Sequence, residues 1–365
     1  MQIRTNPFIY LFHKPIEESL TILEPFEKRY FEITNTFLLD LLDFAKTWKS
    51  ATEIKKLIKS SNNKISRETF ELVFSNLLEQ NILIGKNHPI NKIFYSSKQW
   101  FSNGWDSAFY YHLTSRDYKF LDYSKEEDVL SDRKLMQKYA KLSPPPPIYK
   151  TYKNCKFFKL PKISQRLLRL KFHSNKEHNV ILTTQKLSNF LYLTFGETGS
   201  VNFPVFGKSL LKTSPSGGAR HPSEAYLVLL KDINIPVGVY HYSVKKHGLE
   251  LIEERNFSKF VNEIFFQLNH FPEFEPQAII VITSLFERSM WRYREPRSFR
   301  VILFDIGHLL ATLRVVSQAM GFRVLIGHGF SDEKVKEMLA LEEGDERPFY
   351  FVAIGSFKNE NYLKQ

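Results

Sequence analysis

The chain has 365 residues, 43% hydrophobic and 15% aromatic, so it has ample material for a core, and its length predicts two domains. Its 51 basic and 39 acidic residues give a net charge of +12, but the excess is spread along the chain and selects no class of partner. The single cysteine, Cys155, excludes an internal disulfide bond and a cysteine-based metal cluster.

Targeting and membrane segments are not predicted. Charged residues within Lys14–Glu18 interrupt the only early apolar stretch, so no signal peptide is expected. The longest apolar segment, Val301–Val316, contains an aspartate, a histidine and an arginine, so we do not expect it to span a membrane. These features predict a cytoplasmic protein that does not bind membranes.

The first 85 residues have a helical pattern. Apolar residues recur at helical spacing three times, Ser50 is a suitable N-cap for the second helix, and the strand Ile82–Ile84 follows the third. Three helices and a strand are the plan of a winged helix. The third helix carries three glutamates against Arg67, so binding of nucleic acid is not expected. A peptide added to the edge of a small sheet is the better functional hypothesis, and a plain scaffold is the alternative.

Four consecutive prolines, Pro144–Pro147, form a stiff connector and mark the predicted domain boundary. We predict a winged-helix-like domain over residues 1–143, ending in an aromatic packing connector at Trp100–Tyr123, and a second domain over residues 144–365.

The second domain alternates helical patterns, at Gln185–Phe195 and Asp305–Met320, with short apolar strands. This alternation predicts an α+β fold, in which helices flank a central antiparallel or mixed sheet. The expected strands are Ala225–Leu230, Gln277–Thr283, Val324–Ile326 and Pro348–Ile354.

The segment Lys212–Leu230 (KTSPSGGARHPSEAYLVLL) carries the strongest indication of chemistry. Gly217 and Gly218 allow the backbone to approach a ligand and expose successive amides, while Ser214 and Ser216 add hydroxyl donors. A strand follows directly and gives the loop a rigid support. Composition alone favours a plain turn.

Several motifs, in order, resemble the SagB-type branch of the nitroreductase family. Pro215–Ala219, His221–Pro222 and Glu224–Tyr226 are similar to the branch's PSGGA loop and to the Glu-x-Tyr strand after it. Later blocks are similar to its Lys-Tyr pair, its aromatic-Arg pair, its acidic-x-Gly-His helix start and its last two strands. These blocks are Arg292–Tyr293, Phe299–Arg300, Asp305–His308, Gly321–Gly327 and Phe349–Gly355.

Upstream motifs extend the resemblance to nearly the whole chain. Trp100, Gly104–Trp105, Tyr111–Arg116 and the proline run are similar to the subgroup of peptide maturation dehydrogenases. No metalloprotease, serine-hydrolase or phosphate-loop signature is present, so no metal site is predicted.

The resemblance implies a nitroreductase fold with FMN bound noncovalently at the interface of a homodimer. The loop would lie against the isoalloxazine ring, and arginines would bind the phosphate. The nearest match to the phosphate-binding arginines is Arg166 and Arg169, although Leu167 and Leu168 replace the family's hydroxyl residues between them. The predicted cofactor-binding residues are Arg166, Arg169, Ser214, Pro215, Ser216, Gly217, Gly218, Arg300 and Gly327.

The predicted catalytic residues are Arg292 and Tyr293, which stand where the branch has its Lys-Tyr pair. Arginine keeps its proton near neutrality, so Arg292 cannot be a general base, but it can hold a carbonyl or stabilise an oxyanion. Tyr293 is then the proton-transfer group, with Arg292 and Arg294 favouring its ionised form. A basic loop without a catalytic role is the alternative for Trp291–Arg300.

The leading hypothesis is an FMN-dependent oxidoreductase that modifies a ribosomally synthesised peptide, either by azoline oxidation or by a redox change of a dehydroamino acid. The N-terminal domain would hold a leader peptide, and partner modification enzymes would act on the same peptide. One alternative is a general NAD(P)H-dependent nitro- or quinone reductase. Another is a degenerate peptide-docking subunit, which the departures at Leu167, Leu168 and Arg292 favour.

Overall fold

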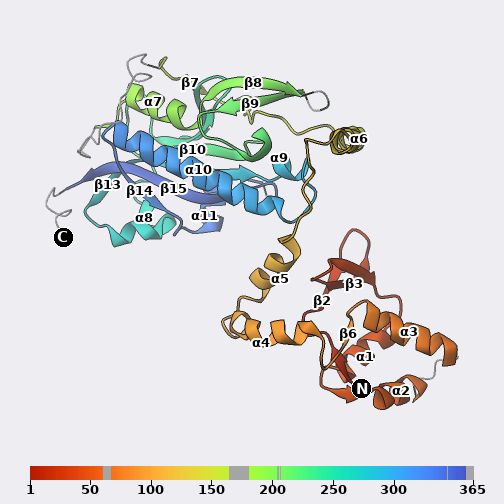
Figure 1. Cartoon of the computed structure of the whole chain (residues 1–365). Coiled ribbons are helices and arrows are strands. Elements are labelled where there is room, and N and C mark those ends of the chain that lie inside the picture. The colour runs from red at the N-terminus through yellow and green to blue at the C-terminus, as the bar shows by residue number, and fades with distance from the viewer. Residues whose placement is uncertain (61–66, 164–180, 204, 206, 343, 359–365) are drawn as a thin grey trace. The chain divides into compact units, whose positions relative to one another are not determined.

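The structure is a computed structural model that describes residues 1–60, 67–163, 181–203, 205, 207–342 and 344–358. The chain forms two compact units, Met1–Lys119 and Phe120–Gln365. The elements of both are labelled in Figure 1. Within the described part of the chain, no helix has the length and apolarity needed to cross a bilayer.

The first unit contains the three helices and the strand that the sequence predicts, together with strands that it does not. The N-cap of α2 is confirmed, because Glu53 N donates to Ser50 Oγ at 3.2 Å and Ser50 N donates back to Glu53 Oε2 at 2.7 Å. The strands form two antiparallel sheets, in the orders β5-β1-β6 and β2-β3-β4. The elements are β1 (Gln2–Thr5), β2 (Tyr10–Lys14), β3 (Ser19–Glu24), β4 (Arg29–Glu32), α1 (Phe37–Phe44), β5 (Lys49–Ser50), α2 (Ala51–Ser60), α3 (Arg67–Glu79) and β6 (Leu83–Gly85).

The aromatic stretch after β6 forms two helices, α4 (Pro89–Ser102) and α5 (Asp106–Ser115). They bury Phe8, whose ring lies 5.5 Å from that of Phe109 and 6.0 Å from that of Phe101. Phe101 and Phe109 of the predicted aromatic connector therefore pack against the turn between β1 and β2, whereas Trp105 and Tyr123 of the same stretch are 60% exposed.

The second unit is built on one seven-stranded antiparallel sheet, of order β14-β15-β13-β10-β11-β12-β7. This confirms the predicted α+β fold, in which helices flank an antiparallel sheet. All four predicted strands are present. The strands are β7 (Phe157–Lys159), β10 (Ser223–Leu229), β11 (Gly238–Ser243), β12 (Gly248–Glu253), β13 (Phe274–Leu285), β14 (Arg323–Gly327) and β15 (Glu346–Phe357), and β8 (Glu197–Phe203) pairs with β9 (Gly207–Lys212) as a separate hairpin.

Helices cover both faces of this sheet because alternate strand residues point to opposite sides. Leu227 packs in the core beneath α7 (Thr184–Phe195) and α10 (Ser298–Ala319), whereas Val228 packs in the core on the other face. That second core lies beneath α8 (Val261–Ile264) and α11 (Asp332–Met338). Both residues are fully buried, which stabilises the fold by about 1.5–3 kcal/mol each.

Helix α10 positions much of the candidate site. Its buried stripe includes Ile306, Leu309 and Leu313, at helical spacing. It ends at Ala319, and the predicted closing glycine, Gly321, follows with a φ of 68°, while Phe322 N donates to Ser317 O at 2.8 Å. The helix starts at Ser298, earlier than the resemblance implies, so the Asp305–His308 motif lies inside it.

Helix α6 (Glu126–Leu142) and the proline run pack within the second unit. Trp291 Nε1 donates to Ser143 O at 3.1 Å, and Arg288 Nε donates to Pro147 O at 3.1 Å. Both donors come from the segment that joins β13 to α10, which begins with the short helix α9 (Glu287–Met290). The proline connector is thus fixed to the segment that follows β13, a strand of the sheet that carries the candidate site.

Candidate active site

A buried aspartate of α10 accepts hydrogen bonds from the loop between β9 and β10 and holds the loop in place. Asp305 is 6% exposed and accepts from Ser216 Oγ at 2.5 Å and from Gly217 N at 2.9 Å. Ser216 Oγ accepts in turn from His221 N at 2.9 Å. Ser214 Oγ donates to Thr194 O at 3.0 Å, at the end of α7. Two helices therefore hold the loop in one shape.

The two glycines are required by close contacts on opposite sides. A Cβ on Gly218 would collide with Tyr293 Oη, and the positive φ of 60° at this position disfavours side chains in any case. A Cβ on Gly217 would collide with the side chain of Val301 on α10. The sequence predicted that the backbone comes close to a ligand here. The structure shows that side chains of the protein itself, Tyr293 and Val301, come close to these glycines.

Tyr293 and Arg292 lie together beside the loop, as the sequence predicts. The Arg292 guanidinium, however, already pairs with a carboxylate: its Nη2 donates to both oxygens of Asp132 on α6, at 2.7 and 2.9 Å. The same nitrogen lies 3.3 Å from Tyr123 Oη, and Arg292 Cζ lies 5.0 Å from the centroid of the Tyr293 ring. The guanidinium thus contributes a fixed positive charge near the phenol.

The other predicted cofactor-binding residues do not all lie beside the loop. Arg300 lies half-buried in the first turns of α10, and Pro215 is exposed on the loop. Gly327 ends β14, where its neighbours are Gln267 and Phe351 rather than the loop. Arg166 and Arg169 lie outside the described residues.

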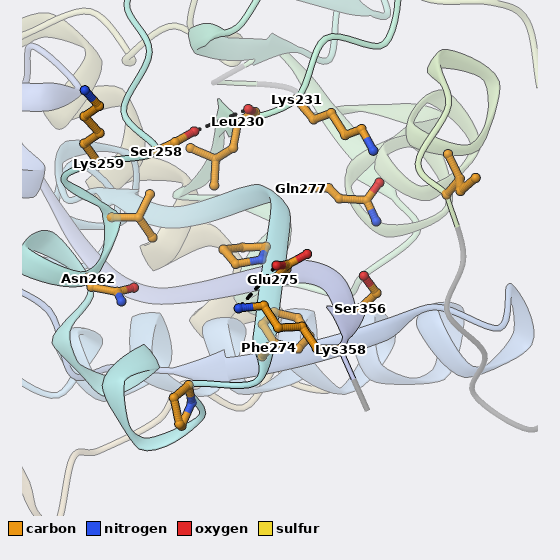
Figure 2. A pocket seen from close by; sticks show the side chains of 14 residues that line it. Leu230, Lys231, Ser258, Lys259, Asn262, Phe274, Glu275, Gln277, Ser356 and Lys358 are labelled. Atoms are coloured by element: carbon orange, nitrogen blue, oxygen red, sulfur yellow. Dashed lines mark hydrogen bonds and ion pairs between the residues drawn. The ribbon is translucent and has the colours of Figure 1, made fainter. Parts of the chain in front are cut away.

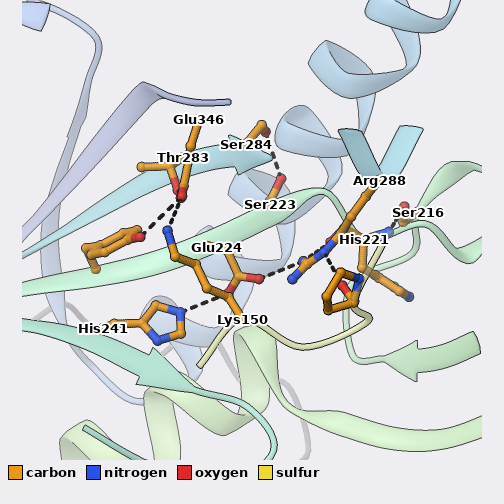
Figure 3. A network of polar contacts seen from close by, with 12 residues as sticks. Lys150, Ser216, His221, Ser223, Glu224, His241, Thr283, Ser284, Arg288 and Glu346 are labelled. Carbon is orange, nitrogen blue, oxygen red and sulfur yellow. Dashed lines mark hydrogen bonds and ion pairs between the residues drawn. The ribbon is translucent and has the colours of Figure 1, made fainter. Parts of the chain in front are cut away.

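A buried ionic network lies under the loop (Figure 3). Glu224 on β10 pairs with Arg288 at 2.6 Å, and His241 bridges Glu224 and Glu250, at 3.1 and 3.0 Å. Burial alone would raise the pKa of Glu224, but Arg288 and the hydrogen bond from His241 hold it well below its usual range. Burial would likewise lower the pKa of His241, whereas its two carboxylate partners raise it. Hydrogen bonds and the Glu224–Arg288 pair therefore bind the cluster together.

The same network reaches the connector. Glu346, the first residue of β15, accepts from Lys150 and Thr283, while Tyr152 Oη lies 2.9 Å from Tyr226 Oη. Arg288 also donates to His221 O at 2.8 Å, at the end of the loop. Lone buried charges are costly, so each charge in this network stabilises the fold only while its partner is present.

The residues around the loop fit a flavin. Thr213 Oγ1 is buried without a hydrogen-bond partner just before the loop, and Gly218 N has none among the described residues. The hollow beneath the loop has only about 20 Å³, room for roughly one water, so a ring system would have to lie on the outer side of the loop, where Pro215 and Gly218 are exposed. A mainly apolar cavity of about 700 Å³, lined by Tyr293, Trp291 and Phe299, shares Tyr293 with the close contact at Gly218 and is large enough for a cofactor.

A further cavity of about 630 Å³ lies elsewhere (Figure 2). It is lined by Leu230, Phe274 and Lys358, where β10 ends, β13 begins and β15 ends. The loop joins the other end of these strands, where Ser223 pairs with Ser284. This cavity is therefore separate from the candidate site. Among the described residues, no cluster of His, Cys, Asp or Glu side chains is suited to a metal ion.

The sequence did not predict the residues that hold other site residues in place. Asp305 stood in a quoted motif but was expected at a helix start, and Glu224 was noted only as part of a strand. Asp132 carried no signal, because it meets Arg292 across 160 positions of sequence. Arg288 had none either, although a lone arginine directly after a buried apolar strand could have been examined for an acidic partner.

Comparisons with known proteins identify the family of the chain. The nitroreductase family model matches residues 187–356. The trifolitoxin-processing protein TfxB of Rhizobium leguminosarum bv. trifolii is 32% identical over 276 residues, 71% of this chain and 71% of that protein. The microcin B17-processing protein McbC of Escherichia coli is 24% identical over 163 residues, 43% of this chain and 58% of that protein.

A crystal structure of an Anabaena variabilis nitroreductase superposes with a TM-score of 0.50 at 26% identity. The match covers 68% of this chain but 45% of that longer chain, so this protein spans less than half of it. The family model covers the helices and strands that carry the loop, and TfxB extends the similarity over most of the chain. The chain therefore belongs to the nitroreductase family of flavin-binding oxidoreductases.

Proposed function

We propose that the protein is an FMN-dependent oxidoreductase that acts in the cytoplasm on a ribosomally made peptide. The observation that carries this proposal is the position of Tyr293 Oη against Gly218, which holds a proton-transfer group beside a loop suited to a flavin. The names of TfxB and McbC, which process trifolitoxin and microcin B17, support a peptide as the substrate.

Bound FMN would supply the hydride chemistry, and the protein would supply orientation and charge. Gly218 N would bind the cofactor, and the loop from Ser214 to Gly217 would keep its shape through Asp305. Arg166, Arg169, Arg300 and Gly327 remain further proposed cofactor-binding residues.

Tyr293 would take a proton from the peptide during oxidation, or give one during reduction. Arg292 is held by Asp132 with its Cζ 5.0 Å from the Tyr293 ring, so its guanidinium would lie beside the proton-transfer group. Because Asp132 already pairs with this guanidinium, Arg292 would stabilise a substrate oxyanion less than an unpaired arginine would.

The first unit would hold the peptide's leader. Strand β4 is an edge strand of its sheet, and Tyr30 on it is 52% exposed. Arg29 Nη1 on the same strand donates to Gln80 Oε1 at 2.8 Å, just after α3, so the open edge runs beside that helix. Leu72 and Val73 on α3 are 63% and 44% exposed. An extended peptide could pair with β4 and cover these apolar side chains.

We also propose a homodimer, with α10 in its interface. Opposite its buried stripe, this helix exposes Leu303, Phe304 and Val315 by 42%, 61% and 42%. An apolar row on a long helix suits packing against a second copy. Light scattering on the purified protein should give twice the mass of one chain, and Phe304→Glu should halve it.

The test uses a synthetic thiazoline-containing peptide and the FMN-loaded full chain without oxygen. Under the proposal, the peptide loses about 2 Da, two hydrogens, as the flavin band bleaches, and Tyr293→Phe slows this by roughly 10²-fold or more. A dehydroamino-acid peptide with the reduced protein tests the opposite direction. Rapid NADPH–menadione turnover with neither peptide changed would instead indicate a general reductase.

A further inference from the structure

A cavity of about 320 Å³ lies on the α6 side of Tyr293. It opens onto Gly218 and Tyr293, the two residues that meet at the proposed reaction centre. Its volume is near the lower end of the range for small-molecule pockets, about 300–1,000 Å³, so it suits one side chain better than a whole ligand. We call it the α6 pocket; its lining is Tyr123, Val129, Asp132, Arg133, Met136, Phe203, Val205, Gly218, Arg220, Arg292 and Tyr293.

One wall of the α6 pocket is a helix that is fastened to the catalytic segment. Besides the Asp132–Arg292 pair, Arg294 Cζ stacks 3.7 Å from the centroid of the Tyr139 ring. Trp291 Nε1 donates to the carbonyl of Ser143, directly after the helix. Contacts from three residues of this segment therefore keep α6 at a fixed distance from Tyr293, and the pocket keeps its width.

The chemistry of the lining favours an apolar occupant. Val129 and Met136 of α6 face the pocket from one side, and Phe203 and Val205 of the β8–β9 hairpin from another. The ion pair in its wall cancels its own charge. Of the other two arginines, Arg220 is positioned by the bond from its Nε to Gly218 O at 2.8 Å and keeps its charge, and Arg133 is exposed to solvent.

We propose that the α6 pocket is a substrate subsite that takes a bulky apolar side chain, carried by the residue next to the one being modified. The proposal rests on the proposed function for its peptide substrate. A fixed apolar pocket beside Tyr293 would set the register of the peptide, because a neighbouring side chain must enter it before the reacting residue reaches Tyr293 Oη.

Binding of amino-acid amides to the FMN-loaded full chain tests the pocket without turnover. Ligand-observed NMR would compare N-acetyl-tryptophanamide with N-acetyl-glycinamide and N-acetyl-glutamic acid amide. We expect the tryptophan probe to bind at least about tenfold more tightly than either of the others. Equal binding of the three, or tightest binding of the glutamate probe, would overturn the apolar assignment.

Variants then locate the binding. Val129→Trp and Val205→Trp fill the pocket from opposite walls, so one remains informative where the other fails to fold. Each should weaken the tryptophan probe by about tenfold or more and leave the FMN content unchanged. Leu130→Trp is the matched control, because Leu130 is 43% exposed on α6 and does not line the pocket; its affinity should stay within about twofold of wild type.

The outcomes separate the two proposals. Undiminished probe binding in both filled variants, or loss of FMN from them, would refute the subsite, the latter because the cofactor would then occupy the pocket. A third outcome is that the filled variants weaken binding of the tryptophan probe while the wild-type protein modifies no peptide. This outcome would uphold an apolar subsite and refute only the peptide oxidoreductase.

Discussion

Asp305→Ala removes the acceptor that holds the loop over α10. Two donors, Ser216 Oγ at 2.5 Å and Gly217 N at 2.9 Å, lose a charged partner, and such hydrogen bonds contribute about 1.5–3 kcal/mol each. Burial raises the pKa of Asp305 while these bonds lower it, so the carboxylate already carries a desolvation cost. We therefore expect each bond to contribute at the lower end of this range, so that the variant loses about 3 kcal/mol in total. This loss is divided between the free energy of unfolding and the order of the loop.

The assay separates these two effects. Urea unfolding measures the free energy of unfolding, and quenching of flavin fluorescence measures FMN affinity. If half of the loss falls on the loop, FMN affinity drops about tenfold. Asp305→Asn keeps one acceptor oxygen and should lie between the alanine variant and wild type. Asp40→Ala, at an exposed position on α1, is the control. An Asp305→Ala protein that binds FMN as tightly as wild type would refute the assigned role of Asp305.

Three further changes test the surroundings of the site. Gly218→Ala should displace Tyr293 and abolish peptide turnover with an unchanged far-UV circular dichroism spectrum; normal turnover would contradict the contact. Glu224→Gln breaks the pair with Arg288 and should cost about 3–5 kcal/mol in urea unfolding, where a loss below about 1 kcal/mol would disprove the network's role. Burial, then the nearby Lys212, lowers the pKa of His221 from 6.5 to about 3, so the unfolded chain takes up this proton first. The free energy of unfolding should therefore fall as the pH drops from 6.5 toward 3, and His221→Gln should flatten that fall.

The sequence predicted the parts of the fold that carry strong local patterns. Helix α10 and strands β10 and β13 have strong apolar patterns, and each of the three begins earlier in the structure than the sequence predicts. Strands β1 to β4 were missed because they are at most six residues long and mix polar with apolar residues. Short strands are specified mainly by their neighbours in the sheet.

The candidate site divides in the same way. The loop and Tyr293 could be predicted because their motifs resemble those of a known family, whereas composition alone favoured a plain turn for the loop. The Asp132–Arg292 and Glu224–Arg288 pairs could not, because each joins segments that only the fold brings together. Arg292 shows the consequence: the sequence identifies the residue type, but only the fold reveals that Asp132 pairs with its guanidinium.

The absorption spectrum of the protein purified without added cofactor tests the central claim most directly, followed by identification of any flavin released on denaturation. The account predicts a band near about 450 nm and release of FMN at roughly one molecule per chain. A colourless protein that also fails to bind added FMN would contradict it, and would leave a peptide-docking protein built on a flavin-binding fold.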